Sequence, residues 1–426
     1  MNPKLRVLLL AVLLAAAVVA AIAYRAREDE FAAVVAVKEA AARSGRSVDP
    51  ALLQFAMPPE RDEFGYPADD IDKREFVALL EAKRYAELEQ RLQALWQATQ
   101  QDIRNEYRLL DAYYAFWRDD VAFRPLVEAW IRARPGSPES NFSAALHYLK
   151  RAQEARGTKW ASDTSAEQFA AVDENNARAT RYLRKALDRE PTHLIGYRAS
   201  FQLLRHGGWG KPQRELLAQA LVAHPTSFLL RADALGDMTP RWGGSYEEMQ
   251  SVAGAAQKHV AANPRLRALL GFVLAEQAFT LQHDGDLDGA LKLYDQALEF
   301  GADSTLLRER AQTWMYMGDP LRAAQDAQRA LRQRPQGLKG LELKAESLYW
   351  LALMAPAAQR ESVLHAAFDH YDLLRTLEPG NAEWQGWLDH ILYARKHCQQ
   401  NPLACGCRNG ESPTKLCRTL ATALRG

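Results

Sequence analysis

Apolar residues recur along most of this chain at the three- and four-residue spacing of helices, and helix-ending residues interrupt them at regular intervals. The interrupting residues are Pro135, Pro191, Pro225, Pro264, Gly301, Pro335 and Pro379. Four of the six intervals between them measure 34 to 39 residues. Because proline cannot continue a helix, this spacing predicts stacked helical hairpins, each of which buries its apolar face against the next.

The hairpin pattern is clearest between Gly271 and Pro335, where a set of mostly small residues recurs 33 positions later. Small residues let two helices approach closely, and a glycine permits the turn between them. A third copy begins at Ala345, but its later members come ten residues late, which predicts an insertion around Met354 to Glu361. The first copy has Ala278, Gly285, Ala290, Tyr294, Ala297 and Leu298, and the second has Ala311, Gly318, Ala323, Ala327, Ala330 and Leu331.

With Trp314 before its glycine and Pro335 at its end, the second copy resembles the tetratricopeptide repeat. The resemblance implies an all-α fold, a tetratricopeptide-like α-solenoid, in which the first helix of each unit lines a groove for a protein or peptide partner. Solvated helix surface and packing between repeats are the alternative roles for the residues that it places in the groove. Those residues are Phe272 and Phe279 in the first copy, and Thr305, Arg308 and Gln312 in the second.

A second resemblance covers the middle of the chain, roughly from Ile71 to Pro264. The stretches that carry it resemble those of an uncharacterised bacterial domain family, which brings no known activity. The resemblance therefore supports a domain and not a function. The stretches are Ala155-Arg156-Gly157, the run from Ser162 to Phe169, and Pro240-Arg241-Trp242-Gly243-Gly244-Ser245.

Composition agrees with an all-α protein, because alanine, leucine, arginine, glutamate and glutamine dominate and strand-like alternation is nearly absent after residue 40. The formal net charge is +1, and acidic and basic residues are interspersed. Nucleic-acid binding requires a concentrated basic surface that contacts phosphates. We therefore expect no nucleic-acid partner.

The run 7–23 is entirely apolar and is flanked by basic residues on both sides. As a helix it would span roughly 26 Å, slightly less than the ~30 Å hydrocarbon core of a bilayer. A signal peptide is the alternative, because Ala21-Ile22-Ala23 resembles a cleavage site. The sequence thus predicts a single-pass protein of the bacterial inner membrane with a periplasmic body, or secretion to the periplasm after signal cleavage.

All four cysteines, Cys398, Cys405, Cys407 and Cys417, lie in the last 29 residues. An even number in a short tail predicts two disulfides and an oxidising compartment. A zinc site with His397 is the alternative, although structural zinc sites have cysteine pairs two to four residues apart and these gaps do not. We expect no resident metal or cofactor.

Two glycine-tryptophan turns are the most distinctive local motifs, one around Trp209 and one around Trp242. In the second turn, Ser245 and Glu248 predict a capping box, and we expect Trp242 to wedge under the turn. The alternative is that Arg241 and Trp242 form a ligand-facing pair, since both residue types are favoured at binding sites. Neither turn has the spacing of a phosphate-binding loop.

No set of residues resembles a catalytic site: the histidines are scattered, and no serine lies in a glycine-flanked elbow. The run Asp284 to Gly289 resembles half of a calcium loop, but helical spacing from Leu287 onward favours a plain hairpin turn. We interpret the aromatic residues from Tyr113 to Trp117 as core packing.

These patterns divide the chain into five parts: a membrane anchor or signal segment (1–27), a linker with a short helix (28–70), a helical-hairpin domain of uncharacterised family (71–264), tetratricopeptide-like repeats (265–396) and a cysteine-rich tail (397–426). The predicted function is a membrane-anchored scaffold or adaptor for protein interactions in the bacterial cell envelope, without enzymatic activity. Two alternatives are an envelope enzyme with its site in the middle domain, and a metal- or small-ligand-binding module centred on the tail.

Overall fold

The computed structural model describes residues 47–157 and 164–397, and this part of the chain is helical with no β-strand beyond one isolated bridge between Arg61 and Pro67. Its α-helices are α2 (Lys73–Glu81), α3 (Tyr85–Gln101), α4 (Glu106–Tyr114), α5 (Phe123–Ala133), α6 (Pro138–Arg156), α7 (Ala166–Leu187), α8 (Leu194–Leu204), α9 (Lys211–Ala223), α10 (Phe228–Asp237), α11 (Tyr246–Ala256), α12 (Leu269–Asp284), α13 (Leu287–Leu298), α14 (Ser304–Tyr316), α15 (Pro320–Gln333), α16 (Leu338–Met354), α17 (Ala357–Leu377) and α18 (Ala382–His397).

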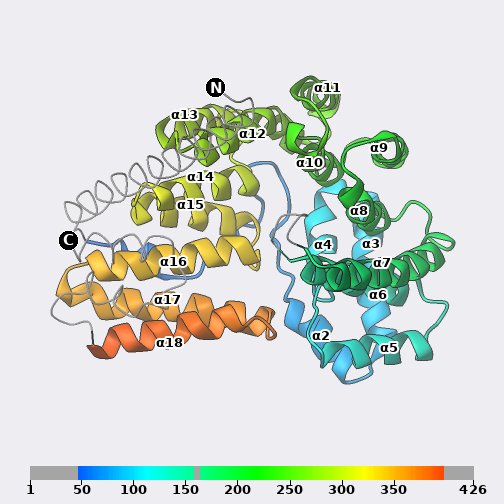
Figure 1. Cartoon of the computed structure of the whole chain (residues 1–426), viewed down its shortest axis with the longest axis horizontal. Helices are drawn as coiled ribbons and strands as arrows, with labels where there is room; N and C mark the ends of the chain where they lie inside the picture. The colour runs from blue at the N-terminus through cyan, green and yellow to red at the C-terminus, as the bar shows by residue number, and fades with distance from the viewer. Residues whose placement is uncertain (1–46, 158–163, 398–426) are drawn as a thin grey trace, which may run out of the picture.

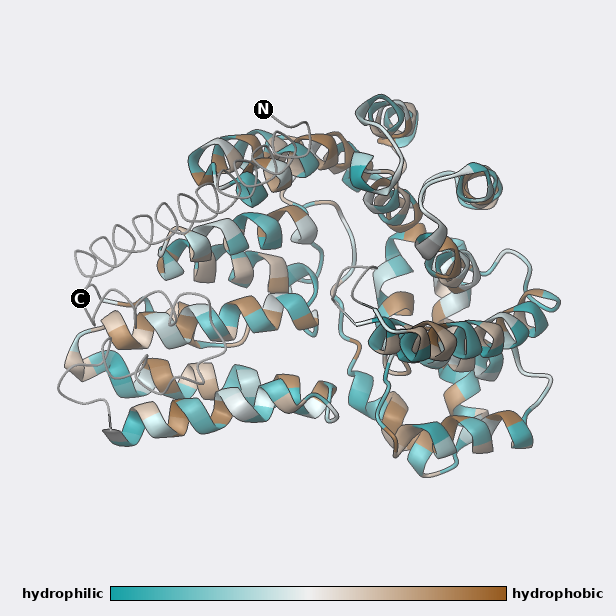
Figure 2. Ribbon diagram, in the orientation of Figure 1, coloured by the Kyte–Doolittle hydropathy of each residue, from teal (hydrophilic) through white to brown (hydrophobic). Residues whose placement is uncertain are grey.

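Neighbouring helices pack in pairs, as a solenoid of helical hairpins requires. Figure 1 shows α14 to α18 stacked as layers in one half of the molecule and α2 to α9 in the other, with α10 and α12 connecting the halves. Figure 2 shows hydrophobic and hydrophilic residues mixed along these helices, as in helices that bury one face and expose the other. The predicted all-α solenoid class is confirmed at this level.

The predicted helix stops fall almost entirely at the ends of second helices. α5, α7, α9, α13, α15 and α17 each end two to four residues before the proline or glycine that the sequence marks as a stop. Pro264 instead opens the short 3-10 helix η7 (Pro264–Ala268), which leads into α12. Proline therefore separates one hairpin from the next, as its missing N–H predicts.

The insertion expected in the third repeat lengthens its helices and does not form a loop. α16 has 17 residues and α17 has 21, compared with 13 in α14 and 14 in α15. Only Ala355 and Pro356 separate α16 from α17. Ala367 and Tyr371 of α17 are two of the repeat members that come ten residues late, and the extra helical turns in this hairpin account for their positions.

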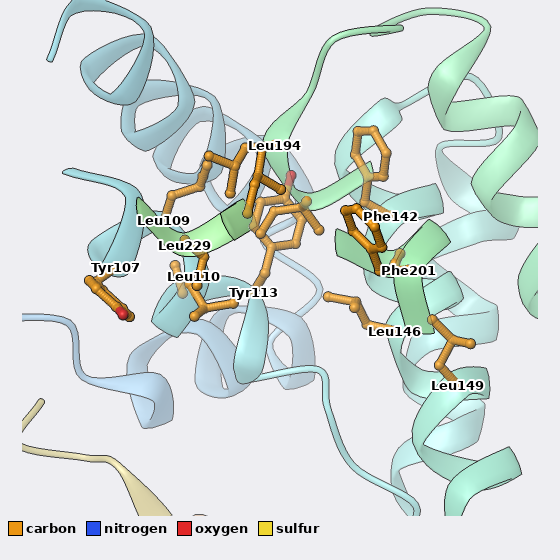
Figure 3. Close-up of a cluster of buried hydrophobic side chains, with 14 of the residues drawn as sticks. Tyr107, Leu109, Leu110, Tyr113, Phe142, Leu146, Leu149, Leu194, Phe201 and Leu229 are labelled. Carbon is orange, nitrogen blue, oxygen red and sulfur yellow. The ribbon is translucent and has the colours of Figure 1, made fainter. Parts of the chain in front are cut away.

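One core cluster fills the first half and continues into α12, and a second fills the hairpins from α14 to α18. Figure 3 shows part of the first cluster, in which Tyr113 of α4 and Phe142 of α6 point toward each other. Their ring centres lie 6.3 Å apart at 85°, a favourable edge-to-face arrangement. The first core therefore ties α4 and α6 to α8 and α10, which supply Leu194, Phe201 and Leu229.

Residues 47–72, which we call the strap, are packed against both halves, although the sequence predicts a linker in this region. The backbone N–H of Val48 donates to Gln359 Oε1 of α17 at 2.9 Å, and Phe55 stacks on His370 with ring centres 4.3 Å apart. Farther along the strap, the hydroxyl of Tyr66 donates to the buried Glu106 of α4 at 2.6 Å. The strap therefore belongs to the folded body.

Arg265 joins the strap to the two halves at a point with almost no solvent access. Its side chain is 1% exposed and donates to Asp303 at 2.9 Å, to Asp62 of the strap at 3.3 Å and to Gln333 at 2.6 Å. Four aromatic rings lie around its guanidinium, with centres 4.5 to 5.3 Å away. This buried cation fixes the relative position of α12, α14 and the end of α15.

The two halves also meet at the far end of the solenoid. Gly380, in the turn between α17 and α18, lies against Asp120 in the loop before α5. A Cβ at this glycine would lie 3.0 Å from the Asp120 Cβ. Nearby, Lys150 of α6 lies 3.8 Å from Glu378. The last hairpin thus closes back onto the first helices, and the inner surface becomes enclosed from several sides.

Candidate functional site

A cleft of about 660 Å³ lies on the inner side of the solenoid. In the described part of the chain, the first helix of each of six successive pairs contributes to its wall: α6, α8, α10, α12, α14 and α16. Residues as far apart in sequence as Lys73 of α2 and Glu378 after α17 face the same space. This arrangement results from the curvature of the stack, which brings its two ends together.

Four of the five predicted groove residues line this cleft: Phe272 and Phe279 from α12, and Thr305 and Arg308 from α14. Gln312 lies one turn beyond Arg308 on α14, is partly buried, and is not part of the cleft wall. The structure therefore brings together all of the predicted groove except its last member.

Of the predicted ligand-facing pair, Arg241 lines the cleft and Trp242 does not. The expected wedge at this turn is wrong, because the Trp242 side chain is 49% exposed. Trp209 of the other glycine-tryptophan turn is the buried one, and its backbone N–H donates to the Trp242 carbonyl oxygen at 2.6 Å. The two turns pack against each other through this bond and through Gly208, where a Cβ would lie 3.0 Å from the same carbonyl oxygen.

The capping box expected after this turn forms only in part. The Ser245 hydroxyl accepts from the Glu248 N–H at 3.2 Å, as an N-cap does. The Glu248 carboxylate does not reach back to Ser245; it pairs with Arg214 of α9 at 2.7 Å. A tertiary ion pair has therefore replaced the second half of the local motif.

Arg241 is held at the cleft wall by an acid and an aromatic ring. Its Nη2 donates to Glu276 of α12 at 2.9 Å, and its guanidinium lies 4.1 Å from the ring centre of Phe279. Burial raises the pKa of Glu276, and the nearby Arg241 offsets part of that rise. The arginine therefore joins the Gly-Trp turn to α12 and keeps both Phe279 and Glu276 in place.

A denser ion-pair network lies at the end of the cleft near α2 and α4. Asp111 accepts from Arg334 at 2.6 Å and lies 3.1 Å from the Lys73 ammonium. Burial opposes ionisation of Asp111, but these two cations outweigh it and hold its pKa well below the usual range. Burial and the Asp111 charge raise the pKa of the neighbouring Asp69, which favours its protonated form. Two cations here thus share one ionised carboxylate.

The aromatic stretch of α4 divides between core and cleft. Tyr113 and Phe116 have no solvent exposure, which confirms core packing for these two. Tyr114 and Trp117 line the cleft, and the Tyr114 hydroxyl accepts from Arg198 Nη1 at 2.6 Å. Phe116 and Trp117 lie just after the end of α4, so helical spacing alone does not specify this split.

Several predicted features lie outside the residues that the structure describes. The apolar run 7–23 and all four cysteines, Cys398, Cys405, Cys407 and Cys417, are among them. In the described ranges, no helix has the length and hydrophobicity to span a bilayer, and no cluster of three or more metal-binding side chains occurs. The membrane segment and the disulfides therefore stay predictions.

The turn with calcium-loop character is a hairpin turn, as the helical spacing indicates. Gly285 ends α12 with φ 92°, a left-handed conformation that glycine adopts without strain. Asp286 then caps α13, its carboxylate accepting from the Gly289 N–H at 2.9 Å. Because α13 begins at Leu287, the residues that a calcium loop would need are helical.

Residues 73–213 match the model of a protein family described as a domain of unknown function, DUF4034. The match begins at the first residue of α2 and ends in α9, within the region that the sequence assigns to an uncharacterised family. It stops before the turn formed by Pro240 to Ser245, so Arg241 lies outside the matched residues. An uncharacterised domain in the middle of the chain is thereby supported.

The wall of the cleft has a mixed chemical character. It combines aromatic rings, aliphatic side chains and both signs of charge, and most of its charged groups are paired with one another. Such a surface can hold a ligand that is apolar in one part and charged in another.

Proposed function

We propose that this protein is a tetratricopeptide-like scaffold that holds a segment of a partner polypeptide in the cleft. The observation that carries the proposal is the convergence of Phe272, Phe279, Thr305 and Arg308 on one space of about 660 Å³. The tetratricopeptide resemblance assigns all four to a partner groove. Repeat proteins bind partners on concave surfaces of this kind.

A polypeptide suits the cleft better than a compact small molecule does. Residues from helices as far apart in the chain as α2 and α17 form its wall, so no single hairpin makes up the cleft. An extended segment could contact several first helices at once and satisfy apolar and charged groups with alternate side chains.

We further propose that this scaffold works in the bacterial cell envelope, tethered by residues 7–23 with its body in the periplasm. The apolar run and the confinement of the cysteines to the tail support this location. A cleaved signal is the alternative. Extraction of membranes at alkaline pH separates the two, because a spanning protein stays in the pellet and a cleaved one is released.

Site-specific photo-crosslinking in living cells tests the scaffold proposal. A benzophenone-bearing residue at position 305 places the crosslinker in the cleft, and the same residue at Lys292 places it on the exposed face of α13. We expect a discrete adduct with a protein partner at position 305 and none at position 292. Equal adducts at both positions, or none at position 305, would contradict a partner in the cleft.

One observation favours an enzyme as a second candidate. The cleft lies beside Arg241 and contains Glu276, whose pKa is raised by burial, as the pKa of a general acid often is. Incubation of envelope extract with the purified protein and with a Glu276→Gln variant tests this. An enzyme requires a product that mass spectrometry detects with the wild type and not with the variant.

A further inference from the structure

Four arginines line the cleft, and one of them differs from the other three. Arg308 of α14 makes no ion pair, hydrogen bond or ring contact with any residue in the described ranges, and its side chain is partly buried. The others are each held by a carboxylate and by an aromatic ring: Arg198 by Asp233 and Tyr114, Arg241 by Glu276 and Phe279, and Arg334 by Asp111 and Tyr107.

An arginine in this position has its binding capacity available for a ligand. The guanidinium presents five N–H donors in a planar fork that matches the two oxygens of a carboxylate. Because the side chain lies inside a cleft, counter-ions screen its charge less than they screen the charge of a surface arginine.

The charge of the wall favours an anionic group over a cationic one. Seven cationic and four acidic side chains line the cleft. Three of the acids are engaged by cations on the wall: Asp233 by Arg198, Glu276 by Arg241, and Glu378 by Lys150. Lys73 and Arg334 share a single ionised carboxylate behind the wall, Asp111. A cationic partner would therefore find few acids without a cation beside them.

Glu309 is the exception among the acids and provides an internal comparison. It neighbours Arg308 on α14, lines the same cleft and has no ion pair among the described residues. The two adjacent side chains have opposite charges, and both are partly buried in the cleft wall. Removing the positive charge should therefore weaken the binding of an acidic partner, whereas removing the negative charge should not.

The apolar part of the wall defines the rest of the partner. Phe272 and Phe279 of α12, Trp117 after α4 and Leu338 of α16 line the cleft and are only partly buried, so they present aromatic and aliphatic surface to it. A segment that carried only carboxylates would leave this surface in water. Aromatic or branched aliphatic side chains between the acids would cover it and gain about 25 cal/mol per Å² of buried apolar area.

We propose that the cleft recognises an extended polypeptide segment in which acidic side chains alternate with aromatic or aliphatic ones, and that Arg308 determines the preference for acids. This inference rests on the proposed scaffold function and specifies its partner. The acids are side-chain carboxylates within the segment, so a free carboxyl terminus is not needed.

Fluorescence anisotropy with three sets of short labelled peptides tests the proposal on the purified full chain. All peptides have amidated C-termini and alternate phenylalanine or leucine with a second residue, which is aspartate or glutamate, glutamine, or lysine in the three sets. We expect the acidic set to bind at least about tenfold more tightly than the glutamine set, the gain from one charge-assisted contact. Added salt should reduce that preference.

Two variants that each remove one charge from the cleft then test the preference for acids. Arg308→Gln should lower the affinity for the acidic set by about tenfold or more. Glu309→Gln should leave the affinity for that set unchanged or raise it. Arg308→Lys should have an affinity between those of the wild type and Arg308→Gln, because lysine keeps the charge but lacks the planar fork of donors. Lys292→Gln, on the exposed face of α13, is the matched control and should bind like the wild type.

The inference is overturned if the glutamine or lysine set binds as tightly as the acidic set. It is overturned as well if the Arg308→Gln variant, with an unchanged melting temperature, binds the acidic set as tightly as the wild type does. It is also overturned if none of the sets binds. The scaffold function is judged separately by the adduct at position 305, since photo-crosslinking does not depend on the charge of the partner.

Discussion

Lys344 of α16 has a buried side-chain amine. Its side chain has no exposed surface, and the nearest partner of its ammonium is the Ala324 carbonyl at 3.4 Å. Among the residues that the structure describes, no carboxylate lies within ion-pair distance of it. Burial lowers the pKa of Lys344 from 10.5 to about 7.

The shift in pKa gives the size and sign of an effect on stability. Because one pKa unit corresponds to about 1.4 kcal/mol, burying the charged amine costs about 4 to 5 kcal/mol below pH 7. Between pH 7 and about 10.4 the unfolded chain keeps this proton while the folded chain releases it. The free energy of unfolding of the wild type should therefore rise with pH through this window.

Lys344→Met removes the amine and retains a side chain of similar length. At pH 7 we expect the variant to be more stable than the wild type by about 2 to 4 kcal/mol, because an unpaired buried charge is replaced by an apolar group. The difference should shrink as pH rises toward 10. Urea unfolding followed by circular dichroism at several pH values measures both effects, with Lys292→Met on the exposed face of α13 as the control.

Two outcomes would refute the reasoning. One is a Lys344→Met variant that is less stable than the wild type at pH 7. The other is a stability difference that does not depend on pH between 7 and 10, which would show that the amine is solvated or paired in the folded protein.

Two further predictions concern the packing of the solenoid. Arg265→Met should lower the free energy of unfolding by about 3 to 5 kcal/mol in urea titrations, because it leaves the fully buried Asp303 without its cation; a smaller loss than that of an exposed ion pair would contradict the role of this residue as a junction. Gly271→Ala should destabilise the protein by about 1 to 3 kcal/mol, since a Cβ at this position would lie 2.4 Å from the Ala297 carbonyl oxygen. Gly254→Ala, at an exposed helical position with no atom within 4 Å of the added Cβ, is its control and should stabilise by up to about 1 kcal/mol in a thermal melt.

The local elements of this protein could be predicted because their signals are local. Pro191, Pro225 and Pro335 lack the N–H that would continue a helix, so each one separates two hairpins wherever the rest of the chain lies. Gly285 and Gly318 both adopt positive φ at the turns that the repeat pattern assigns to them. Most of the groove could be predicted for a related reason, since the same repeat specifies which helix faces inward.

Side chains with two possible environments could not be assigned from the sequence. Trp242 and Trp209 occupy similar glycine-rich turns, and only the packing of one turn on the other buries Trp209 and exposes Trp242. Lys344 follows the helical pattern of α16 as a polar residue would, yet its position between α15 and α17 excludes water. In each case the deciding contact comes from a segment distant in sequence.

The sequence by itself thus determined the helices, their pairing into hairpins and the identity of most inward-facing residues, because proline, glycine and small residues act within a few positions of themselves. Only the tertiary structure decided how far the stack curves. That curvature places Lys73, Arg308 and Glu378 on one cleft and packs the strap against α17. It is the sum of many small packing angles between helices, which no single residue specifies.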